Sequence, residues 1–400
     1  MEPKIRFKGF EGEWIETSLS NLSSNFKYGI NAAAVSFDGE NKYLRITDID
    51  DTMHSFLQND VTSPGTDLSC CDEYLMQDGD IVIARTGASV GKSYIYHPFD
   101  GKVYFAGFLI RMRLNENTNR DFVFQNTLTN AYAKHVQFVS QRSGQPGINV
   151  NELQAYKLRI PSLSEQQFIA TYFRTLDNKI QSTSKKLASL KKLKSASLVA
   201  MFPQNGESKP KVRFNGFEGE WSTNNLGSIF AERIESNENG EMLSVTMNNG
   251  IIRSSDNGRF DNSNSDKSKY KVVKIGDIAY NSMRMWQGAS GVSQYEGIVS
   301  PAYTVVTPSV DVDTDFFGYL FKTVDVIRLF KLNSQGLTSD NWNLKYPAFS
   351  RICVSYPESK EEQQAIATFF RSLDRKIALE TARLEKLKQI KLACLDKMFV

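Results

Sequence analysis

Two stretches of the chain carry apolar residues at alternating spacings of four and three positions, the pattern of a helical coiled-coil seam. In the first stretch the seam consists of Ile169, Phe173, Leu176, Ile180, Leu187 and Leu190. In the second it consists of Ile366, Phe370, Leu373, Ile377, Leu384 and Leu387. A polar residue interrupts each seam at the equivalent site, Thr183 in one and Glu380 in the other. The pattern predicts two helices of roughly 38 residues, about 57 Å long at 1.5 Å per residue.

Short runs of β-branched and aromatic residues, bounded by Gly and Asp, predict strands in the rest of both halves. These runs are 43–46, 80–84, 93–96 and 103–105 in the first half, and 242–245, 277–280 and 303–306 in the second. Two further segments, 122–129 and 316–329, are predicted to be helices. The strands are separated by loops dense in Gly, Ser, Asn, Gln and Arg, especially 85–93, 141–149, 281–294 and 333–343. The mixture indicates α+β domains with loops suited to polar recognition.

The two halves repeat each other at their ends. Residues 3–14 return as residues 210–221 with identity at 10 of 12 positions, and residues 165–180 return as 362–377 with identity at 12 of 16. The segments between these blocks share only scattered tripeptides, such as Gly-Asp-Ile at 79–81 and at 276–278. A solenoid would repeat throughout with a period of about 20–50 residues, so two globular domains on a shared scaffold fit better.

The repeats divide the chain into four predicted parts. Residues 1–160 and 210–356 form the two variable domains, and residues 161–209 and 357–400 form the two helical regions. Helices of equal length that each close a repeat can pair antiparallel and hold the variable domains apart in a pseudo-two-fold relation. The predicted fold class is therefore α+β, with two globular domains joined by an antiparallel coiled coil and an internal duplication.

Composition and charge exclude several classes of protein. The chain has 400 residues, 40% hydrophobic and 23% charged, which is typical of a globular protein with full-sized cores. Nowhere do 18 apolar residues follow one another, so we expect a cytoplasmic protein without a membrane partner. The four cysteines form no C-x-x-C pair, which argues against a zinc site. The net charge of +3 neither demands nor forbids a nucleic-acid partner.

The repeated blocks resemble the DNA-specificity subunit of a type I restriction-modification system over the whole chain. The opening stretches, residues 4–14 and 211–221, match a K-x-R-F-x-x-F-x-G-E-W pattern, and residues 165–177 and 362–374 match an E-Q-Q-x-I-A-x-x-F-x-x-L-D signature. The resemblance implies two target-recognition domains that read a two-part target in double-stranded DNA, without catalysis in this chain. It also implies two modification subunits that carry S-adenosylmethionine and two restriction subunits that use ATP and Mg, so no cofactor is expected here.

The loops supply candidate DNA contacts because arginine reads guanine edges, asparagine and glutamine read adenine, and lysine binds phosphate. Our candidates in the first domain are Arg85, Thr86, Lys92, Arg142, Ser143 and Gln145. In the second domain they are Asn281, Arg284, Gln287, Gln335, Thr338 and Asn341, with Trp286 as a stacking or wedge residue. The loops as sets are a firmer prediction than their single members, since such residues also occur in solvated turns.

Signatures of catalysis are incomplete. The stretch 87–93 resembles a phosphate-binding loop but has three residues between its glycines where that motif has four. The Ser-Pro-Ala-Tyr stretch at 300–303 lacks one proline of the loop that seats a base in amino-methyltransferases, and no S-adenosylmethionine loop accompanies it. The alternative function is a coiled-coil adaptor with two heads that bind proteins or glycans, which composition alone allows.

Overall fold

A computed structural model describes residues 2–141, 144–204, 206–247, 249–257, 266–337 and 341–400. The chain divides into two compact units. The first unit contains Met1–Lys186 and Glu380–Val400, and the second contains Leu187–Leu379. Each unit therefore combines one variable domain with part of each long helix. The predicted domain limits at 160/161, 209/210 and 356/357 follow the sequence repeats, whereas the limits of the two compact units fall within the long helices.

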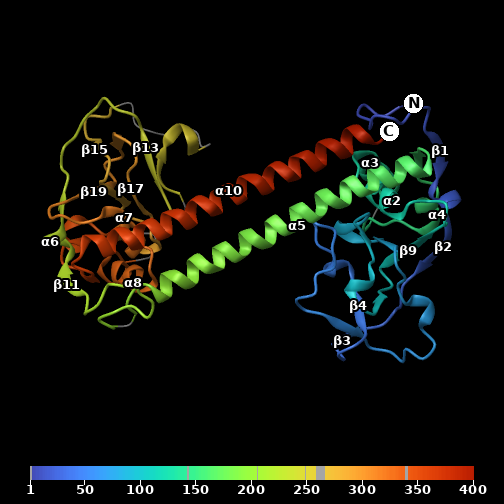
Figure 1. The fold of residues 1–400 in the computed structure, drawn as a ribbon, viewed down its shortest axis with the longest axis horizontal. Helices are drawn as coiled ribbons and strands as arrows, with labels where there is room; N and C mark the ends of the chain where they lie inside the picture. Colours follow the sequence, from blue (N-terminus) through green and yellow to red (C-terminus); the bar gives the residue numbers. More distant parts are fainter. Residues whose placement is uncertain (1, 142–143, 205, 248, 258–265, 338–340) are drawn as a thin grey trace. The chain divides into compact units, whose positions relative to one another are not determined.

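The first unit is built from short strands and helices followed by one long helix (Figure 1). Its elements are β1 (Ile15–Ser18), α1 (Leu19–Leu22), β2 (Ser23–Tyr28), β3 (Ala34–Ser36), β4 (Lys42–Leu44), β5 (Thr62–Pro64), β6 (Ile81–Ala84), β7 (Ser93–Ile95), β8 (Val103–Phe105), β9 (Leu109–Leu114), α2 (Arg120–Asn126), α3 (Asn130–Val139), α4 (Val150–Gln154), β10 (Lys157–Ile160) and the start of α5 (Leu163–Ala200). Its central sheet is antiparallel with the order β2-β9-β6-β7.

The second unit repeats this plan. Its elements are the end of α5, β11 (Ser222–Asn225), α6 (Leu226–Ile229), β12 (Phe230–Glu232), β13 (Leu243–Thr246), β14 (Gly250–Arg253), β15 (Lys271–Val273), β16 (Ile278–Asn281), β17 (Ser290–Val292), β18 (Gly297–Val299), β19 (Tyr303–Pro308), α7 (Thr314–Leu320), α8 (Val324–Asn333), α9 (Tyr346–Phe349), β20 (Cys353–Tyr356) and the start of α10 (Lys360–Met398). The sheet β12-β19-β16-β17 corresponds to β2-β9-β6-β7, strand for strand.

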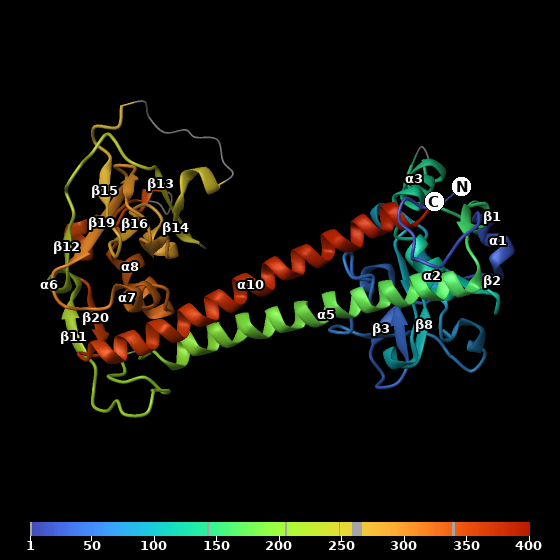
Figure 2. The same cartoon turned by 45° about the horizontal axis from the view of Figure 1, so that its top comes forward.

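The two long helices confirm the periodicity prediction. They contain 38 and 39 residues, and in each unit a part of α5 lies beside a part of α10 (Figure 1, Figure 2). In the first unit Asp177 pairs with Lys391 at 2.7 Å, and in the second Asp374 pairs with Lys194 at 2.5 Å. From the first pair to the second, the residue number rises from 177 to 194 on α5 and falls from 391 to 374 on α10, so the two helices run antiparallel. Both interrupting residues, Thr183 and Glu380, are buried.

The repeated sequence blocks hold each unit's scaffold together. In the first unit, the Arg6 guanidinium donates two hydrogen bonds of 2.8 Å to Glu165, whose carboxylate is buried at the start of α5. In the second, Arg213 donates two bonds of 2.7 Å to Glu362 on α10. These bonds raise the pKa of both guanidinium groups and pin the opening segment of each repeat to a helix.

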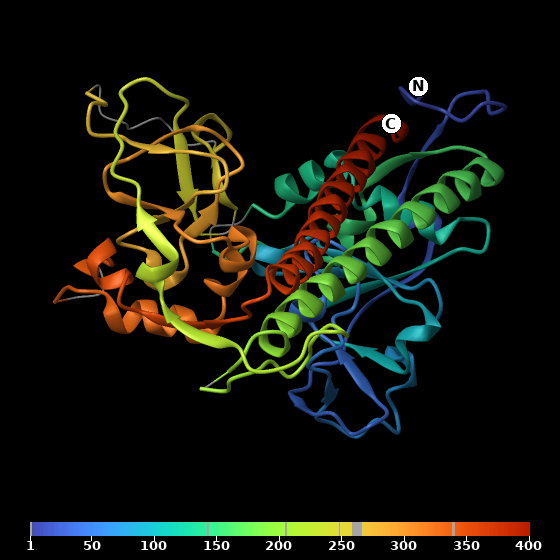
Figure 3. The same cartoon turned by 60° about the vertical axis from the view of Figure 1, so that its left-hand side comes forward.

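Each core is closed by an aromatic cluster that the repeats also explain. Trp14, Phe122, Phe173 and Phe399 pack together in the first unit with ring centroids 5.1–6.4 Å apart. Trp221, Phe316, Phe370 and Phe202 pack in the same way in the second, at 5.5–6.1 Å. The chain's last residues thus complete the first core, and the N-terminal segment lies beside the end of α10 (Figure 3). There the Ile5 amide donates to the Lys397 carbonyl.

One element prediction is wrong. The segment 316–329 is not a single helix, because α7 ends at Leu320 and α8 begins at Val324. Thr323 lies between them in an extended conformation with φ −71° and ψ 150°. Its hydroxyl donates to the Leu320 carbonyl at 2.7 Å, which closes the first helix. The apolar spacing continues across the break because both helices bury aromatic residues in one core.

Candidate nucleic-acid interface

Each unit has a hollow at the same end of its central sheet, where the third strand ends and the second begins. The first hollow, about 610 Å³, opens beyond the last residue of β6 and the first of β9. The second hollow, about 590 Å³, opens beyond the paired residues Asn281 of β16 and Tyr303 of β19. The two hollows are therefore equivalent in the fold, although their residues differ.

The first hollow presents an arginine stacked on a tyrosine. The Arg85 guanidinium lies 4.5 Å from the centre of the Tyr28 ring. Its Nε atom has no hydrogen-bond partner among the described residues, and its Nη1 contacts only the Gly107 carbonyl, at 3.5 Å. Phe108 on the same rim is 62% exposed. The Arg85 guanidinium thus lies over an aromatic ring, and its Nη groups are the kind of donor with which arginine reads a base edge.

The wall of the first hollow explains the orientation of Tyr28. A Cβ atom added to Gly29 would lie 2.3 Å from the carbonyl oxygens of Phe105 and Ala106, so only glycine allows this approach. Another cation of the wall, Arg45, is already engaged. It donates to Asp48 at 2.8 Å, which raises the pKa of the guanidinium and neutralises its charge locally. Arg85 is thus the better-placed donor for a ligand.

The other candidates in the first unit have different surroundings. Thr86 forms a bridge with Gly147 and is partly buried, which brings the 85–93 and 141–149 loops together. Gln145 is exposed on the second of these loops. Lys92 donates to the Ile49 carbonyl at 2.8 Å and to Asp51 at 2.7 Å, an arrangement that favours a structural role. Arg142 and Ser143 lie outside the described residues.

The second hollow brings three candidates together. Asn281, Arg284 and Gln287 line it, with Tyr303 on the strand beside them. Arg284 is exposed and donates through Nη1 to the side-chain oxygen Oε1 of Gln287 at 3.3 Å. The side-chain oxygen Oδ1 of Asn281 accepts from the Met283 amide at 3.0 Å. Burial raises the pKa of the Tyr303 hydroxyl, so this group stays a neutral donor.

Trp286 lies next to this hollow and is held from two sides. Its Nε1 donates to the Met283 carbonyl at 3.1 Å, and its ring meets Trp342 edge to face at 5.2 Å. Lys331 lies 5.4 Å from the Trp342 ring. Gln335 pairs through its backbone with Asn343, and both Gln335 and Asn341 are exposed on the same loop. Thr338 lies outside the described residues.

Sequence reasoning missed the aromatic members of both hollows. Phe108 in the first hollow and Tyr303 in the second were not among the candidates, since an aromatic residue near a strand end is usually a core residue. For Phe108 the available signal is its position next to Gly107 in the short connection between β8 and β9, where an exposed ring has no core to enter.

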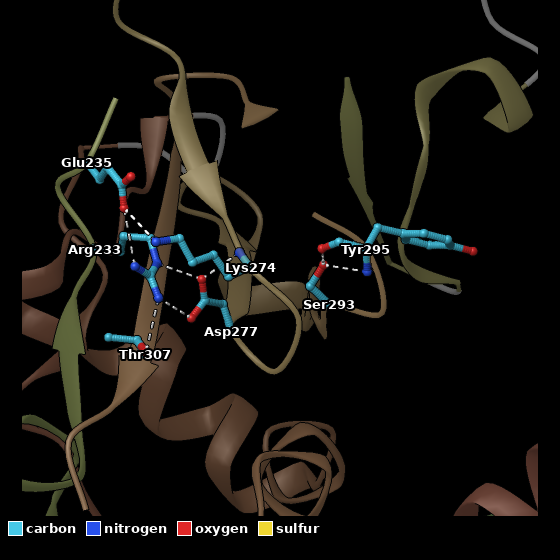
Figure 4. A network of polar contacts seen from close by, with 7 residues as sticks. All are labelled: Arg233, Glu235, Lys274, Asp277, Ser293, Tyr295 and Thr307. Atoms are coloured by element: carbon cyan, nitrogen blue, oxygen red, sulfur yellow. Dashed lines mark hydrogen bonds and ion pairs between the residues drawn. The ribbon is translucent and has the colours of Figure 1, made fainter. Parts of the chain in front are cut away.

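An aspartate and arginine clamp lies at the other end of each sheet. In the second unit Asp277 accepts from Arg233 Nε at 2.6 Å and Nη2 at 2.9 Å, and from the Lys274 amide at 2.8 Å (Figure 4). In the first unit Asp80 accepts in the same way from Arg113 at 2.8 and 2.7 Å. Both carboxylates are buried and raise the pKa of their arginines. The shared Gly-Asp-Ile tripeptide is therefore a structural element.

The histidines show no arrangement for nucleophilic catalysis. His54 Nδ1 contacts the Ser93 carbonyl at 2.9 Å, His135 Nε2 contacts the Glu152 carbonyl at 3.2 Å, and His97 stacks on Phe99 at 5.3 Å. Burial lowers the pKa of His54. No helix in the described part of the chain combines the length and apolar composition that a bilayer crossing requires.

Comparison with known proteins agrees with this architecture. The family model of the type I restriction modification DNA specificity domain matches residues 23–192 and again 219–389. The type I restriction-modification S subunit from M. genitalium has a similar fold, with TM-score 0.68, 15% identity and coverage of 100% of this chain and 99% of that one.

Two further structures resemble the chain more distantly. The HsdS subunit from Thermoanaerobacter tengcongensis has TM-score 0.45 and 15% identity, with 96% of each chain covered. A chain from a study of complex assembly and conformational transition in the type I R-M system has TM-score 0.49 and 14% identity, with 96% of this chain and 97% of that one covered. No curated protein matches the sequence significantly.

Proposed function

Because the chain belongs to the type I restriction-modification DNA specificity family, we propose that it reads a two-part DNA target and directs partner subunits to it. Each unit contacts one half-site, and the paired helices set the number of base pairs between the half-sites. The chain itself contributes no catalytic group. Two modification subunits bring S-adenosylmethionine, and two ATP- and Mg-dependent restriction subunits cut unmodified DNA.

One observation carries this proposal: equivalent ends of the two central sheets bear hollows of similar volume with different polar residues. Arg85 and its tyrosine platform suit a guanine, whereas Asn281, Arg284 and Gln287 offer both amide and guanidinium donors. A common scaffold with two different reading surfaces is what a target with two unlike halves requires. Surface lysines and arginines supply phosphate contacts, although the net charge of only +3 leaves part of that task to partner subunits.

The test is to map methylated sites by single-molecule sequencing in cells that contain the candidate modification subunit, with and without this chain. The expected result is a gapped two-part motif that appears only with the chain. An intact complex that adds no motif would contradict the proposal and favour an adaptor that binds proteins or glycans. Replacing residues 15–160 by another variable domain should change one half of the motif only.

Arg85→Ala gives a residue-level test of the first hollow. Loss of one bidentate base contact costs about 1–3 kcal/mol, so binding to the mapped target should weaken by about 5- to 150-fold. Discrimination at one base of one half-site should fall with it. Arg120→Ala is the matched control, because Arg120 pairs with Asp78 and donates to its carbonyl, away from the hollow. Equal effects of both variants on affinity and base preference would contradict the assignment of Arg85.

A further inference from the structure

A partly buried lysine of the second unit is bonded to backbone carbonyls in place of a carboxylate. Lys322, between α7 and α8, donates through Nζ to the Ser290 carbonyl at 2.9 Å, to the Met247 carbonyl at 3.4 Å and also to the Gly288 carbonyl. Among the described residues, no carboxylate forms an ion pair with it. Buried cations normally have an acidic partner, so this arrangement needs a reason.

The three carbonyls belong to two segments that form walls of the second hollow. Gly288 and Ser290 end the loop that carries Asn281, Arg284 and Gln287. Met247 directly follows β13, and Thr246, Met247 and Asn249 also line this hollow. A single ammonium group thus ties the two walls together.

We propose that Lys322 is a positioning residue for DNA reading by the second unit, because its ammonium joins the 281–290 loop to the β13–β14 turn and sets the width of the hollow. This inference rests on the proposed function, since it assigns Lys322 to the hollow that contacts the second half-site. Lys322 acts through the residues that touch DNA and does not itself touch a base.

The first unit shows that the fold does not require a lysine here. Leu128 occupies the corresponding place, between α2 and α3 and directly before Thr129, as Lys322 directly precedes Thr323. Leu128 is an apolar neighbour of the first core. An uncharged side chain at this place is therefore compatible with the scaffold, and the lysine serves something particular to the second unit.

The surroundings of Lys322 give it a distinctive pH response. Burial lowers its pKa to about 8, and Lys194 of α5, itself paired with Asp374 of α10, adds a like charge. The loop and the turn present backbone carbonyls to it, and α8 presents Ile327 beside Gly288. Below pH 8 the ammonium donates three charge-assisted bonds. Above it the neutral amine has two weaker ones, so the walls should loosen as pH rises.

The first experiment maps methylation in cells with wild-type chain, Lys322→Met or Lys269→Met, each with the modification subunit. Lys269→Met removes the same charge from an exposed lysine of the same unit. With Lys322→Met, sites that carry one mismatch in the second half-site should gain methylation at least tenfold, while the first half-site stays as strict as in the wild type. Lys269→Met should change neither half-site.

The main measurement of the second experiment uses the wild-type complex and duplexes that contain the mapped motif, so it does not depend on the folding of a variant. The preference for the correct second half-site over a single mismatch should fall at least threefold from pH 7 to pH 9, with the first half-site unaffected. Lys322→Met should have a flat profile. Equal strictness of Lys322→Met and wild type, equal loss at both half-sites, or an unchanged pH profile in the wild type would each overturn the inference. Absence of any chain-dependent motif in wild-type cells would instead overturn the proposed function.

Discussion

The aromatic closure of the first core leads to a quantitative prediction for Phe399→Ala. Phe399 is the second-to-last residue of the chain, yet it is only 9% exposed and packs on Trp14, Phe122 and Phe173. Removing its ring leaves a cavity between the opening segment, α2 and α5. Phe202→Ala makes the equivalent change in the second unit, where Phe202 is 1% exposed.

The magnitude follows from burial. Truncating a buried Phe to Ala costs about 3–5 kcal/mol, from lost transfer free energy and from the cavity that remains. Phe399, which is 9% exposed, belongs at the lower end, about 3 kcal/mol, whereas Phe202, which is 1% exposed, belongs at the upper end. At about 1.4 kcal/mol per factor of ten, 3 kcal/mol is roughly a hundredfold in the opening equilibrium of the unit.

Hydrogen–deuterium exchange followed by mass spectrometry separates the two units. With Phe399→Ala, amides of β1 and α2 should exchange roughly a hundredfold faster, and amides of β11 and α7 should keep wild-type rates. Phe202→Ala should show the reverse. Acceleration of less than fivefold for Phe399→Ala, or equal acceleration in both units, would refute the view that the chain's end completes the first core alone.

Two further predictions concern buried charge. Arg213→Met should destabilise the second unit by about 3–5 kcal/mol in denaturant unfolding, because among the described residues the buried Glu362 carboxylate then keeps only the hydrogen bond from Trp221 Nε1, at 3.4 Å. The double variant Arg213→Met with Glu362→Gln should regain at least half of this loss, and no recovery would contradict the electrostatic cause. Leu128→Lys should lower the Tm of the first unit by several degrees, since it places a cation near Lys391; an unchanged Tm would refute it.

The long helices and most central strands could be predicted because their signals are local. Spacings of three and four marked α5 and α10, and runs of β-branched residues marked 80–84 and 303–306, which became β6 and β19. The boundary between α7 and α8 was not predicted. The Thr323 hydroxyl ends α7 by donating to the Leu320 carbonyl, while the apolar pattern continues across the break. Periodicity reports which face is buried, and it does not report where the backbone turns.

The proposed DNA-contacting surfaces could be predicted from the sequence as loops, and less well as single residues. The 281–294 loop supplies Asn281, Arg284 and Gln287 to one hollow, as the composition of the loop suggested. In contrast, the Lys92 ammonium already forms an ion pair with Asp51, a residue 41 positions away in the sequence. Sequence composition shows which side chains can bind DNA. Tertiary packing decides which of these charged side chains already form an ion pair within the protein.

The two clamps explain why aligning the halves cannot identify the reading residues. Asp80 and Asp277 sit at the same position of the fold, yet Arg113 comes from β9 and Arg233 directly follows β12. The aspartate was kept after duplication because its carboxylate also closes the turn before its strand. Asp80 accepts from the Gln77 amide, and Asp277 accepts from the Lys274 amide. The donor was free to change strand: Arg113 lies on β9, next to β6, whereas Arg233 follows β12, which β19 separates from β16, and Arg233 also contacts Thr307 of β19. The hollows follow the same rule, with a common backbone frame and contact residues drawn from different strands and loops in each unit.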